Sequence, residues 1–289
     1  MLAAQILLSG VTAGSIYALV ALGFVLIHKA TRVVHFGLGE QVTLGAYLVI
    51  IGQFRTGLPF YPAILLALVA AGAIGFLIER LIMRPIRLRP VLVQVIATLA
   101  VGLAIRECLR AFMGPQAWPF RFLLSPDPVR IGGLYFAWAN LAIVVASFAV
   151  MAALYAFFAH AKLGKAVLAA CENQVGAFLM GIPVPSVLTA IWIMASVLAA
   201  IAGILIAPIV TLSPEMGLIG IKGFTAAVLG GFNSLPGAVA GGFLLGVIET
   251  AAGIYVSTAM KDATTFLLLI LVIILKPHGL FGYRAVKKV

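Results

Sequence analysis

Long runs of apolar residues, separated by short polar links, recur along almost the whole chain. A helix that crosses the hydrocarbon core of a bilayer needs about 20 mainly apolar residues, because each residue adds about 1.5 Å. Runs of this kind cover residues 4–28, 36–54, 61–83, 91–113, 134–160, 184–212 and 262–276. The pattern therefore predicts a series of transmembrane helices.

The remaining stretch, 216–256, is too long for one crossing and is rich in glycine. A break at Asn233-Ser234-Leu235-Pro236 predicts a short helix followed by a full one, because proline interrupts a helix interior. We therefore predict an all-α integral membrane protein with about eight or nine crossings. Nine fits the alternation of the chain best, and eight would require 36–54 or 218–232 to be re-entrant. Residues 1–289 then form a single transmembrane domain.

Composition points to the same class of protein. Hydrophobic residues make up 64% of the chain and charged residues 9%, whereas roughly 25% of residues are charged in soluble domains. A soluble domain of this size cannot hide so much apolar surface, but lipid is itself an apolar solvent. The two cysteines, Cys108 and Cys171, lack the spacing of a zinc site or a disulfide framework. We interpret them as small apolar side chains.

The net charge of +11 is less informative than the positions of the basic residues. Lys and Arg collect in the cytoplasmic loops of membrane proteins, so we expect lipid and no nucleic acid as a partner. Basic residues flank or follow the first, third, fifth and last predicted segments: Lys29, Arg32, Arg80, Arg84, Arg87, Arg89, Lys162, Lys165, Lys276, Arg284, Lys287 and Lys288. The opposite links carry Arg55, Arg121, Arg130 and Lys261. This asymmetry predicts an external N-terminus and a cytoplasmic C-terminus.

Small residues recur at intervals of four in several predicted helices. The three series are Gly10 and Gly14; Ala67, Ala71 and Gly75; and Ala238, Gly242 and Gly246. Small side chains let the backbones of membrane helices approach closely and gain van der Waals contact. The simpler interpretation is a tightly packed bundle, and the alternative is that some series form sliding or dimer surfaces.

The two halves of the chain resemble each other faintly. Gly45, followed by the series ending at Gly75 and Glu79, resembles Gly230-Gly231, followed by the series ending at Gly246 and Glu249. The predicted orientation runs these two stretches in opposite directions. The pattern therefore predicts an inverted repeat, an arrangement that places a path at the repeat interface.

Several charged residues fall within predicted spans. They are Glu40, Glu79, Arg106, Glu107, Arg110 and Glu249. Charged groups at membrane depth are costly and usually face a protein interior or a water-filled path. Arg106 and Arg110 lie near a predicted helix end, where they can extend to the interface, and the same holds for Glu79. Glu249 lies nearer mid-span and is the best candidate for a buried polar contact.

The sequence contains no recognisable enzyme motif. The four histidines are scattered, and no HExxH, nucleophile elbow or paired-carboxylate motif is present. The phosphate-binding pattern GxxxxGK[ST] is absent, and no link is long enough for a soluble domain. We therefore expect neither enzymatic activity nor an ATPase domain in this chain.

The link 160–185 differs from the others. Alanines and apolar residues at helical spacing, ending at Gly181, predict a short helix that lies outside the membrane on the cytoplasmic side. Such a helix suits docking to a soluble partner, although helices at the membrane interface are also common.

This link resembles the coupling loop of ABC importer permeases, and other stretches resemble the LivH-type permeases of branched-chain amino-acid importers. Four stretches match in order. The first is Gly14–Gly23, and the second is His35–Tyr47, which contains Phe36, Gly39, Glu40 and Gly45-Ala46-Tyr47. The third contains Leu229-Gly230-Gly231, Pro236-Gly237-Ala238 and Gly241-Gly242, followed by Gly246 and Glu249, and the fourth is Lys276–Gly282. Together they cover nearly the whole chain in order. The combination is specific, although each part is loose.

The resemblance implies an ABC importer permease fold, without a cofactor in this chain, in a bacterial inner membrane. It implies a second related permease, two cytoplasmic ATPases that use ATP, and an external substrate-binding protein as partners. The implied coupling residues are Gly164, Lys165, Ala169, Ala170, Glu172, Asn173 and Gly181. The implied residues of the translocation path are Gly39, Glu40, Thr43, Gly230, Gly231 and Glu249.

The chain also departs from the family pattern. Leu168 stands where the family commonly carries Arg, and no basic residue lies near Phe178; His35 replaces an Asn and Leu38 a His. Two alternatives to amino-acid import stay open. One is an ABC permease for urea, short amides or sugars, and the other is an ATP-independent secondary transporter or channel, which leaves the 160–185 link unexplained.

Overall fold

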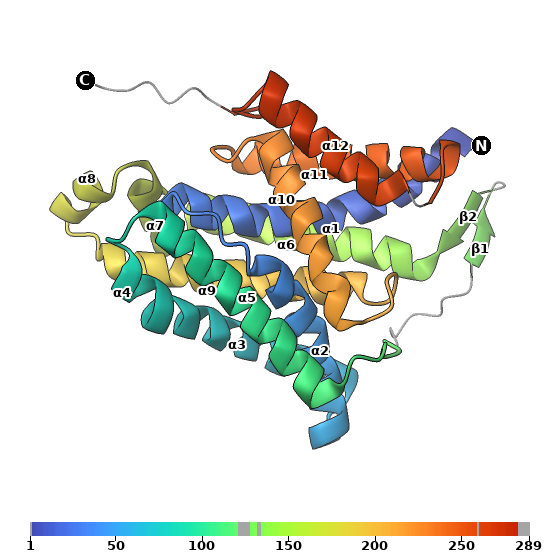
Figure 1. The fold of residues 1–289 in the computed structure, drawn as a ribbon, viewed down its shortest axis with the longest axis horizontal. Helices are drawn as coiled ribbons and strands as arrows, with labels where there is room; N and C mark the ends of the chain where they lie inside the picture. Colours follow the sequence, from blue (N-terminus) through green and yellow to red (C-terminus); the bar gives the residue numbers. More distant parts are fainter. Residues whose placement is uncertain (1, 121–127, 132–133, 259, 283–289) are drawn as a thin grey trace.

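The computed structural model describes residues 2–120, 128–131, 134–258 and 260–282, and helices make up most of them (Figure 1). The first part contains α1 Leu2–Thr31, α2 Leu38–Thr56, α3 Phe60–Leu77, the π-helix η1 Ile78–Met83, α4 Arg84–Ile86 and α5 Val91–Met113. Strands β1 Pro128–Ile131 and β2 Leu134–Ala137 precede α6 Trp138–His160. The rest contains α7 Lys162–Glu172, α8 Gln174–Leu179, α9 Val184–Ile206, the 3-10 helix η2 Pro214–Leu218, α10 Ile219–Gly230, α11 Leu235–Tyr255 and α12 Met260–Leu275.

The predicted segments match these helices with two main differences. Residues 134–137, predicted as the start of a helix, form β2 and pair antiparallel with β1, which suits their aromatic residues Tyr135 and Phe136. The segment predicted to reach residue 212 ends at Ile206 as α9, and Pro208 follows directly, where a helix cannot easily continue. The predicted break at 233–236 separates α10 from α11. Arg121, Arg284, Lys287 and Lys288, used in the charge argument, lie outside the described residues.

Six helical stretches in the described part of the chain are long and apolar enough to cross a membrane. They are α1, α3 with its continuation through η1 and α4, α5, α6, α9 and α11. Three other helices have weaker signals: α12 has 16 residues, α10 has 12, and α2 carries charged residues near both ends. Adding these three to the six agrees with the predicted eight or nine crossings. The chain is thus a multi-pass, all-helical membrane protein apart from the short hairpin.

Helices α2 and α10 begin inside the bundle. The backbone N–H of Phe36, just before α2, donates a hydrogen bond to the hydroxyl of Thr98 (3.3 Å), and Thr98 lies about two turns into α5. A methyl group on Gly39 would overlap the carbonyl oxygen of Gly217 and meet the Cα of Gly220. The starts of α2 and α10 therefore touch each other; segment 32–37 leads into α2, and segment 207–213 followed by η2 leads into α10.

The helix contacts reveal two equivalent units. α1 packs against α11 as α9 packs against α3, and α2 packs against α9 as α10 packs against α1. The contacts α2–α3 and α2–α5 likewise correspond to α10–α11 and α10–α12. In Figure 1, α1 runs from the N-terminus at the right towards the left, whereas α9 starts near α8 at the left and runs to the right. The two units therefore run in opposite directions, as expected for the predicted inverted repeat.

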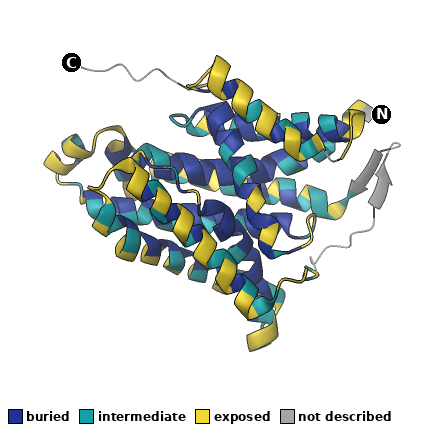
Figure 2. Ribbon diagram, in the orientation of Figure 1, coloured by how far each residue is buried: buried dark blue, intermediate teal, exposed yellow. Residues whose placement is uncertain are grey.

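Helix α1 lies at the centre of the molecule (Figure 2). Its most apolar stretch is 89% buried, whereas that of α5 is only 17% buried. The glycine series of α1 and α11 face each other. A methyl group on Gly10 would lie 2.7 Å from the Cα of Val247, and a methyl group on Gly14 would lie 2.8 Å from the Cα of Phe243. In the second series, Gly75 of α3 lies against Ser196 of α9. All three series thus pack inside the bundle, as in the simpler of the two interpretations.

Candidate functional site

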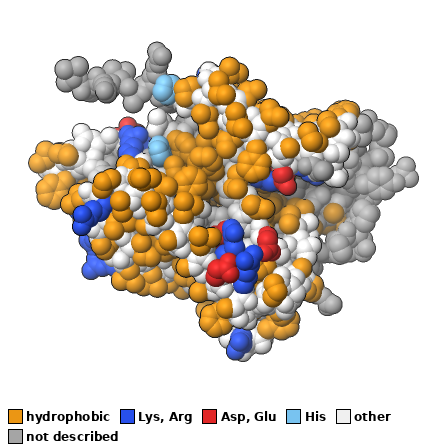
Figure 3. Space-filling view, in the orientation of Figure 1, with side chains coloured by type: hydrophobic (Ala, Val, Ile, Leu, Met, Phe, Trp, Pro, Cys, Tyr) orange, Lys and Arg blue, Asp and Glu red, His pale blue; other side chains and the backbone are white. Residues whose placement is uncertain are grey.

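A cavity of about 310 Å³ lies where the start of α2 meets α1, α5, α10 and α12. Helices α5, α10 and α12 lie on the face seen in Figure 3, where hydrophobic side chains surround small groups of acidic and basic ones. The cavity is lined by Phe24, Phe36, Glu40, Leu99, Gly102, Leu103, Arg106, Gly217, Leu218, Gly220, Ile221, Phe224 and Leu269. Among these side chains, two are charged and nearly all the others are apolar.

Glycines create the space in which this cavity forms. A methyl group on Gly217 would overlap the carboxylate of Glu40, and one on Gly102 would lie 3.0 Å from the Cα of Gly37 and 3.3 Å from the Cγ of Glu40. Larger residues at these positions would push α2 away from α5 and α10. The glycines therefore allow a carboxylate to lie between three helix backbones inside the bundle.

Glu40 and Arg106 form an ion pair at this position. Glu40 is only 6% exposed and lies in the first turn of α2, where the helix dipole favours a negative charge. Its Oε1 accepts a hydrogen bond from Arg106, whereas its Oε2 has no hydrogen-bond partner among the described residues. The Nε of Arg106 is also without a partner in the described part of the chain. The pair therefore keeps unused hydrogen-bonding capacity next to the cavity.

Aromatic rings lead from the cavity towards one end of the molecule. The ring centroids of Phe36 and Phe224 are 5.5 Å apart, and those of Phe224 and Phe232 are 5.6 Å apart. Phe232 in turn lies 4.6 Å from the ring of His28, near the end of α1. This end also carries α4, α7 and α8 (Figure 1). The rings form an apolar line from mid-bundle to that end.

A second charged cluster lies beside α12 and was not singled out from the sequence. The Nζ of Lys222 lies 2.7 Å from Glu249 and 2.9 Å from Asp262, and 5.8 Å from the centroid of the Tyr17 ring. Glu249 is buried, as the sequence suggested, but it does not line the 310 Å³ cavity. A lysine inside the predicted span 216–256 was the signal that could have revealed this cluster.

The other predicted path residues lie outside the cavity lining. Thr43 is fully buried on α2. Gly230 and Gly231 hold the C-terminal turn against the end of α10: the backbone N–H of Phe281 donates to the carbonyl of Gly230 (3.2 Å), and Gly231 has a φ of +103°. Of the predicted path residues, only Glu40 lines this cavity, and Gly39 lies next to it against Gly217 and Gly220.

Glu79 is buried, although the sequence placed it at the membrane interface. It is 4% exposed and accepts a hydrogen bond from the hydroxyl of Thr189 on α9 (2.8 Å). It belongs to η1, the short π-helix that continues α3. Burial among the helices is compatible with a position near the end of the span, where the exposed Arg80 and the half-buried Arg84 follow.

The 160–185 link forms two helices rather than one. α7 ends at Glu172 and α8 begins at Gln174, with Asn173 in an extended conformation between them. The side-chain oxygen of Asn173 accepts a hydrogen bond from the backbone N–H of Gly176 (2.9 Å), which caps the start of α8. This cap explains why the chain turns at Asn173 instead of continuing as a single helix.

The link is fastened to the end of α1. The Nζ of Lys29 lies 2.8 Å from Glu172, and the amide of Gln174 donates to the carbonyl of Ala30 (2.6 Å). The hydrogen bond from Lys29 holds the pKa of Glu172 below its usual value. Gly164 packs against the backbone of Phe157, where a side chain would not fit. A displacement of α8 would therefore strain or move the end of α1 through these contacts.

The tip of the link exposes a group of large apolar side chains. Their exposed fractions are 70% for Val175, 67% for Phe178, 77% for Leu179 and 83% for Met180. Gly181 follows with a φ of +80°, a conformation that favours glycine. Of the other predicted coupling residues, Ala170 is buried against the bundle, whereas Lys165 and Ala169 are exposed on α7. The tip is thus an apolar surface without a covering element among the described residues.

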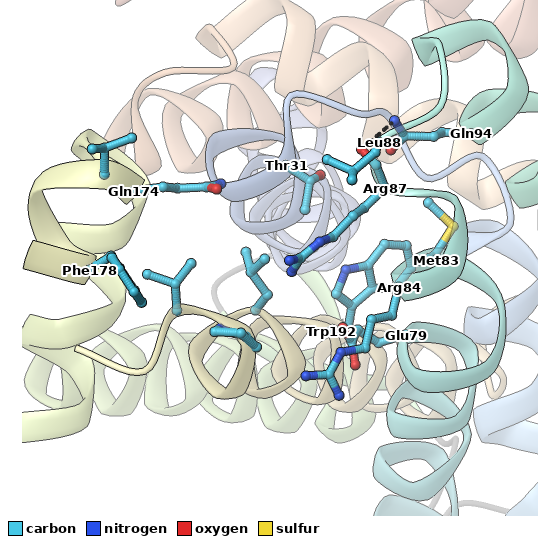
Figure 4. A pocket seen from close by; sticks show the side chains of 14 residues that line it. Thr31, Glu79, Met83, Arg84, Arg87, Leu88, Gln94, Gln174, Phe178 and Trp192 are labelled. Atoms are coloured by element: carbon cyan, nitrogen blue, oxygen red, sulfur yellow. Dashed lines mark hydrogen bonds between the residues drawn. The ribbon is translucent and has the colours of Figure 1, made fainter. Parts of the chain in front are cut away.

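A second cavity, of about 440 Å³, lies directly beside this tip. Figure 4 shows Arg84 and Arg87 pointing into it from one side, with Gln174 and Phe178 of α8 on the other. Trp192 of α9 also lines it. Because α8 forms one wall, movement of the tip would change the shape of this cavity.

The departures from the family pattern lie away from the 310 Å³ cavity. His35 is fully buried, its ring centroid lies 4.8 Å from that of Trp192, and its Nε2 lies 3.1 Å from the amide nitrogen of Gln41. Leu38 is also fully buried. Leu168 on α7 packs partly against the core. These residues contribute to packing rather than to the cavity lining.

Comparison with known proteins agrees with this architecture. A chain of PsaBC from Streptococcus pneumoniae, solved in complex with Fab, resembles this chain with a TM-score of 0.51 and 14% sequence identity. The match covers 95% of this chain and 91% of that chain. At this level of identity the likeness concerns the fold alone.

Sequence relatives match over nearly the whole chain. The high-affinity branched-chain amino acid transport system permease protein LivH of Salmonella typhimurium is 31% identical, over 99% of this chain and 97% of that protein. The corresponding BraD of Pseudomonas aeruginosa is 32% identical over the same shares. A probable LivH of Methanocaldococcus jannaschii is 28% identical, over 96% and 92%. The family described as the permease component of branched-chain amino acid transport systems matches residues 6–274. The chain therefore belongs to the family of branched-chain amino acid transport system permease components.

Proposed function

We propose that this chain is the membrane-spanning permease subunit of an ATP-driven importer of branched-chain or related amino acids. Membership of the permease family and the names of its relatives support this function. In this proposal the chain pairs with a second related permease, two cytoplasmic ATPases and an extracytoplasmic binding protein. It lies in a bacterial inner membrane with its N-terminus outside and its C-terminus in the cytoplasm.

The observation that carries the proposal is the exposed apolar tip of α8. Val175, Phe178 and Leu179 are largely exposed at the end of the molecule where the basic links of α4 and α7 also lie. Exposed apolar patches of this kind mark surfaces that bind a partner. We assign this surface to the ATPase, which binds ATP and moves the tip. Lys29, Gln174 and the 440 Å³ cavity provide the connection to α1 and α9.

The substrate path in this proposal follows the face that carries the 310 Å³ cavity. The second permease covers that face, and the substrate crosses between the two subunits past Glu40 and the line of aromatic rings. Movement of α1, transmitted from α8, changes the contacts of Phe24 and His28 along this line. The chain itself then performs no covalent chemistry, and ATP is used by the partner subunits.

The test is purification of the tagged complex, with measurement of ATP hydrolysis and uptake in proteoliposomes. We expect Phe178→Ala/Leu179→Ala to lower leucine-stimulated ATP hydrolysis about tenfold or more while the permease still inserts, because the docking surface is lost. Leu163→Ala is the matched control, since it shortens an exposed apolar side chain on α7 away from the tip. It should behave as wild type.

Three outcomes contradict the proposal in different ways. Normal coupling in the Phe178→Ala/Leu179→Ala variant removes the tip from the mechanism. Uptake by the permease alone without ATP favours a secondary transporter. Uptake of urea, a short amide or a sugar in place of leucine keeps the importer and changes its cargo.

A further inference from the structure

We propose that Glu40 and Arg106 receive the two charged ends of an amino-acid substrate as it passes through the permease. Arg106 receives the α-carboxylate, and Glu40 receives the α-ammonium group. This inference rests on the proposed function, and it assigns recognition of the zwitterion to one pair of side chains on the path.

The first argument is the unused bonding capacity of the pair. A carboxylate offers about four acceptor positions and a guanidinium five N–H donors. The Oε2 of Glu40 and the Nε of Arg106 are both buried without a partner among the residues that the structure describes. An ammonium group supplies donors for Oε2, and a carboxylate supplies acceptors for the guanidinium. A zwitterion therefore satisfies both groups at once.

The second argument is the shape and lining of the adjoining cavity. Its volume of about 310 Å³ is at the lower end of the range for ligand pockets, about 300–1,000 Å³. Phe36, Leu103 and Phe224 provide apolar walls beside the charged pair. A small molecule with two opposite charges at one end and an apolar side chain at the other matches this division.

The third argument is the electrostatic balance inside the bilayer. Charged groups at membrane depth are usually found on substrate pathways and paired with one another. A buried ion pair is itself a weak stabiliser, because desolvation of the two charges offsets their attraction. When a zwitterion separates the pair, each side chain gains an opposite charge, so the site stays neutral throughout. Arg106 lines the cavity and its side chain is 28% exposed, so it is able to move without unpacking the core.

This arrangement also discriminates between amino acids and the other substrates of related permeases. Urea and sugars carry no charge, so they do not replace either partner of the ion pair, which stays intact. A compound with one charge, such as leucinamide or 4-methylpentanoate, leaves Arg106 or Glu40 unpaired in a low-dielectric site. The pair therefore selects for zwitterions, and the apolar walls select for the side chain.

The principal test removes both charges together. Glu40→Gln/Arg106→Gln keeps a polar side chain at both positions and leaves neither charge without its partner, so a purely structural ion pair predicts normal transport. We expect uptake of labelled leucine by the complete complex to fall at least about tenfold, while the purified complex still contains all of its subunits. The control Arg110→Gln/Glu215→Gln removes a more exposed Arg–Glu ion pair (2.6 Å) one turn along α5, outside the cavity lining. This control should transport leucine normally.

A second measurement keeps the pair intact and so does not depend on the folding of that variant. Leu103→Cys places a thiol in the cavity wall of a Cys108→Ser/Cys171→Ser protein. We expect millimolar leucine to slow thiol labelling of the detergent-purified permease. Leucinamide and 4-methylpentanoate, which each lack one charge, should protect less than leucine.

The results separate the two proposals. Leucine uptake by wild type with equal uptake by the doubly neutral variant overturns the inference and leaves the importer in place. Equal protection by all three compounds, or protection by none, also overturns the inference. A wild-type complex that imports no amino acid overturns the proposed function as well.

Discussion

At the scale of single residues, glycines decide how closely the helices approach. Gly246 of α11 lies against the backbone of Gly10 and Gly14 on α1, so even a methyl group would overlap main-chain atoms. Main-chain atoms cannot rotate away as the end of a flexible side chain can. The contact between α1 and α11 therefore depends on the absence of a side chain at this position.

Gly246→Ala is expected to destabilise the protein by about 1–3 kcal/mol, the usual cost of overpacking. Thermal unfolding in detergent measures this loss. Gly72→Ala is the matched control, because its methyl group would meet only side chains at ordinary contact distance, those of Ile193 (3.4 Å) and Val197 (3.5 Å). Alanine also has a higher helix propensity by about 1 kcal/mol, so the control should be neutral or slightly more stable. Equal effects of the two substitutions would contradict the role given to this contact.

Individual charged residues could be identified from the sequence, but their partners could not. Glu40 and Arg106 each stood out as charges within predicted spans, yet their pairing depends on α2 starting inside the bundle. The spacing of residues along the sequence does not show how deep inside the bundle a helix begins. Glu79 was predicted near the membrane interface, and its burial and its hydrogen bond to Thr189 could not be predicted from its position in the sequence. Lys222 was overlooked, although a lysine within a span is itself a signal.

At the scale of elements, the break between α7 and α8 directs the apolar tip away from the bundle. Helical spacing predicted one helix here, whereas the structure has two with Asn173 between them. Asparagine is a favoured N-cap residue, so the residue type offered a signal for the break. The spacing of apolar residues could not reveal it, because α7 and α8 carry the same type of pattern.

Asn173→Ala should loosen α8 by removing its cap, at a cost of about 1 kcal/mol. We expect faster hydrogen exchange at the amides of α8, with exchange in α9 unchanged. Asn173→Asp is the control, since aspartate caps a helix as well as asparagine does. Slow exchange in both variants would show that the contacts with Ala30 and the bundle hold α8 without its cap.

At the scale of the whole molecule, the fold consists of two equivalent helical units that run in opposite directions and pack together around the buried helices. Hydropathy was sufficient to predict the long spans, because each crossing requires a run of apolar residues. The faint glycine echo also predicted an inverted repeat, and the matching helix contacts and the opposite directions of α1 and α9 agree with it (Figure 1). The segments 36–54 and 218–232 were named as candidates for re-entrant segments, but the inward starts of α2 and α10 could not be placed, because a helix that begins at mid-depth looks like a short or polar span in sequence.

The orientation of the molecule can be tested with single cysteines in the Cys108→Ser/Cys171→Ser background. Gln116, which is exposed after α5, should react with a membrane-impermeant maleimide in spheroplasts when replaced by Cys. Val175→Cys on α8 should react only after permeabilisation, because the basic links place that end in the cytoplasm. The reverse pattern would invert the proposed orientation and with it the side that meets the ATPase.

The central position of α1 has a consequence for how the chain is made. α1 leaves the ribosome long before its main partner, α11, which follows more than 200 residues later. Until α11 is present, the glycine face of α1 contacts lipid or other helices instead of the glycine face of α11. The contact between α1 and α11 therefore forms only after α11 has been synthesised. A chain that stops before α11 leaves its first helix without its main partner, and the cell can recognise such a product as unfinished.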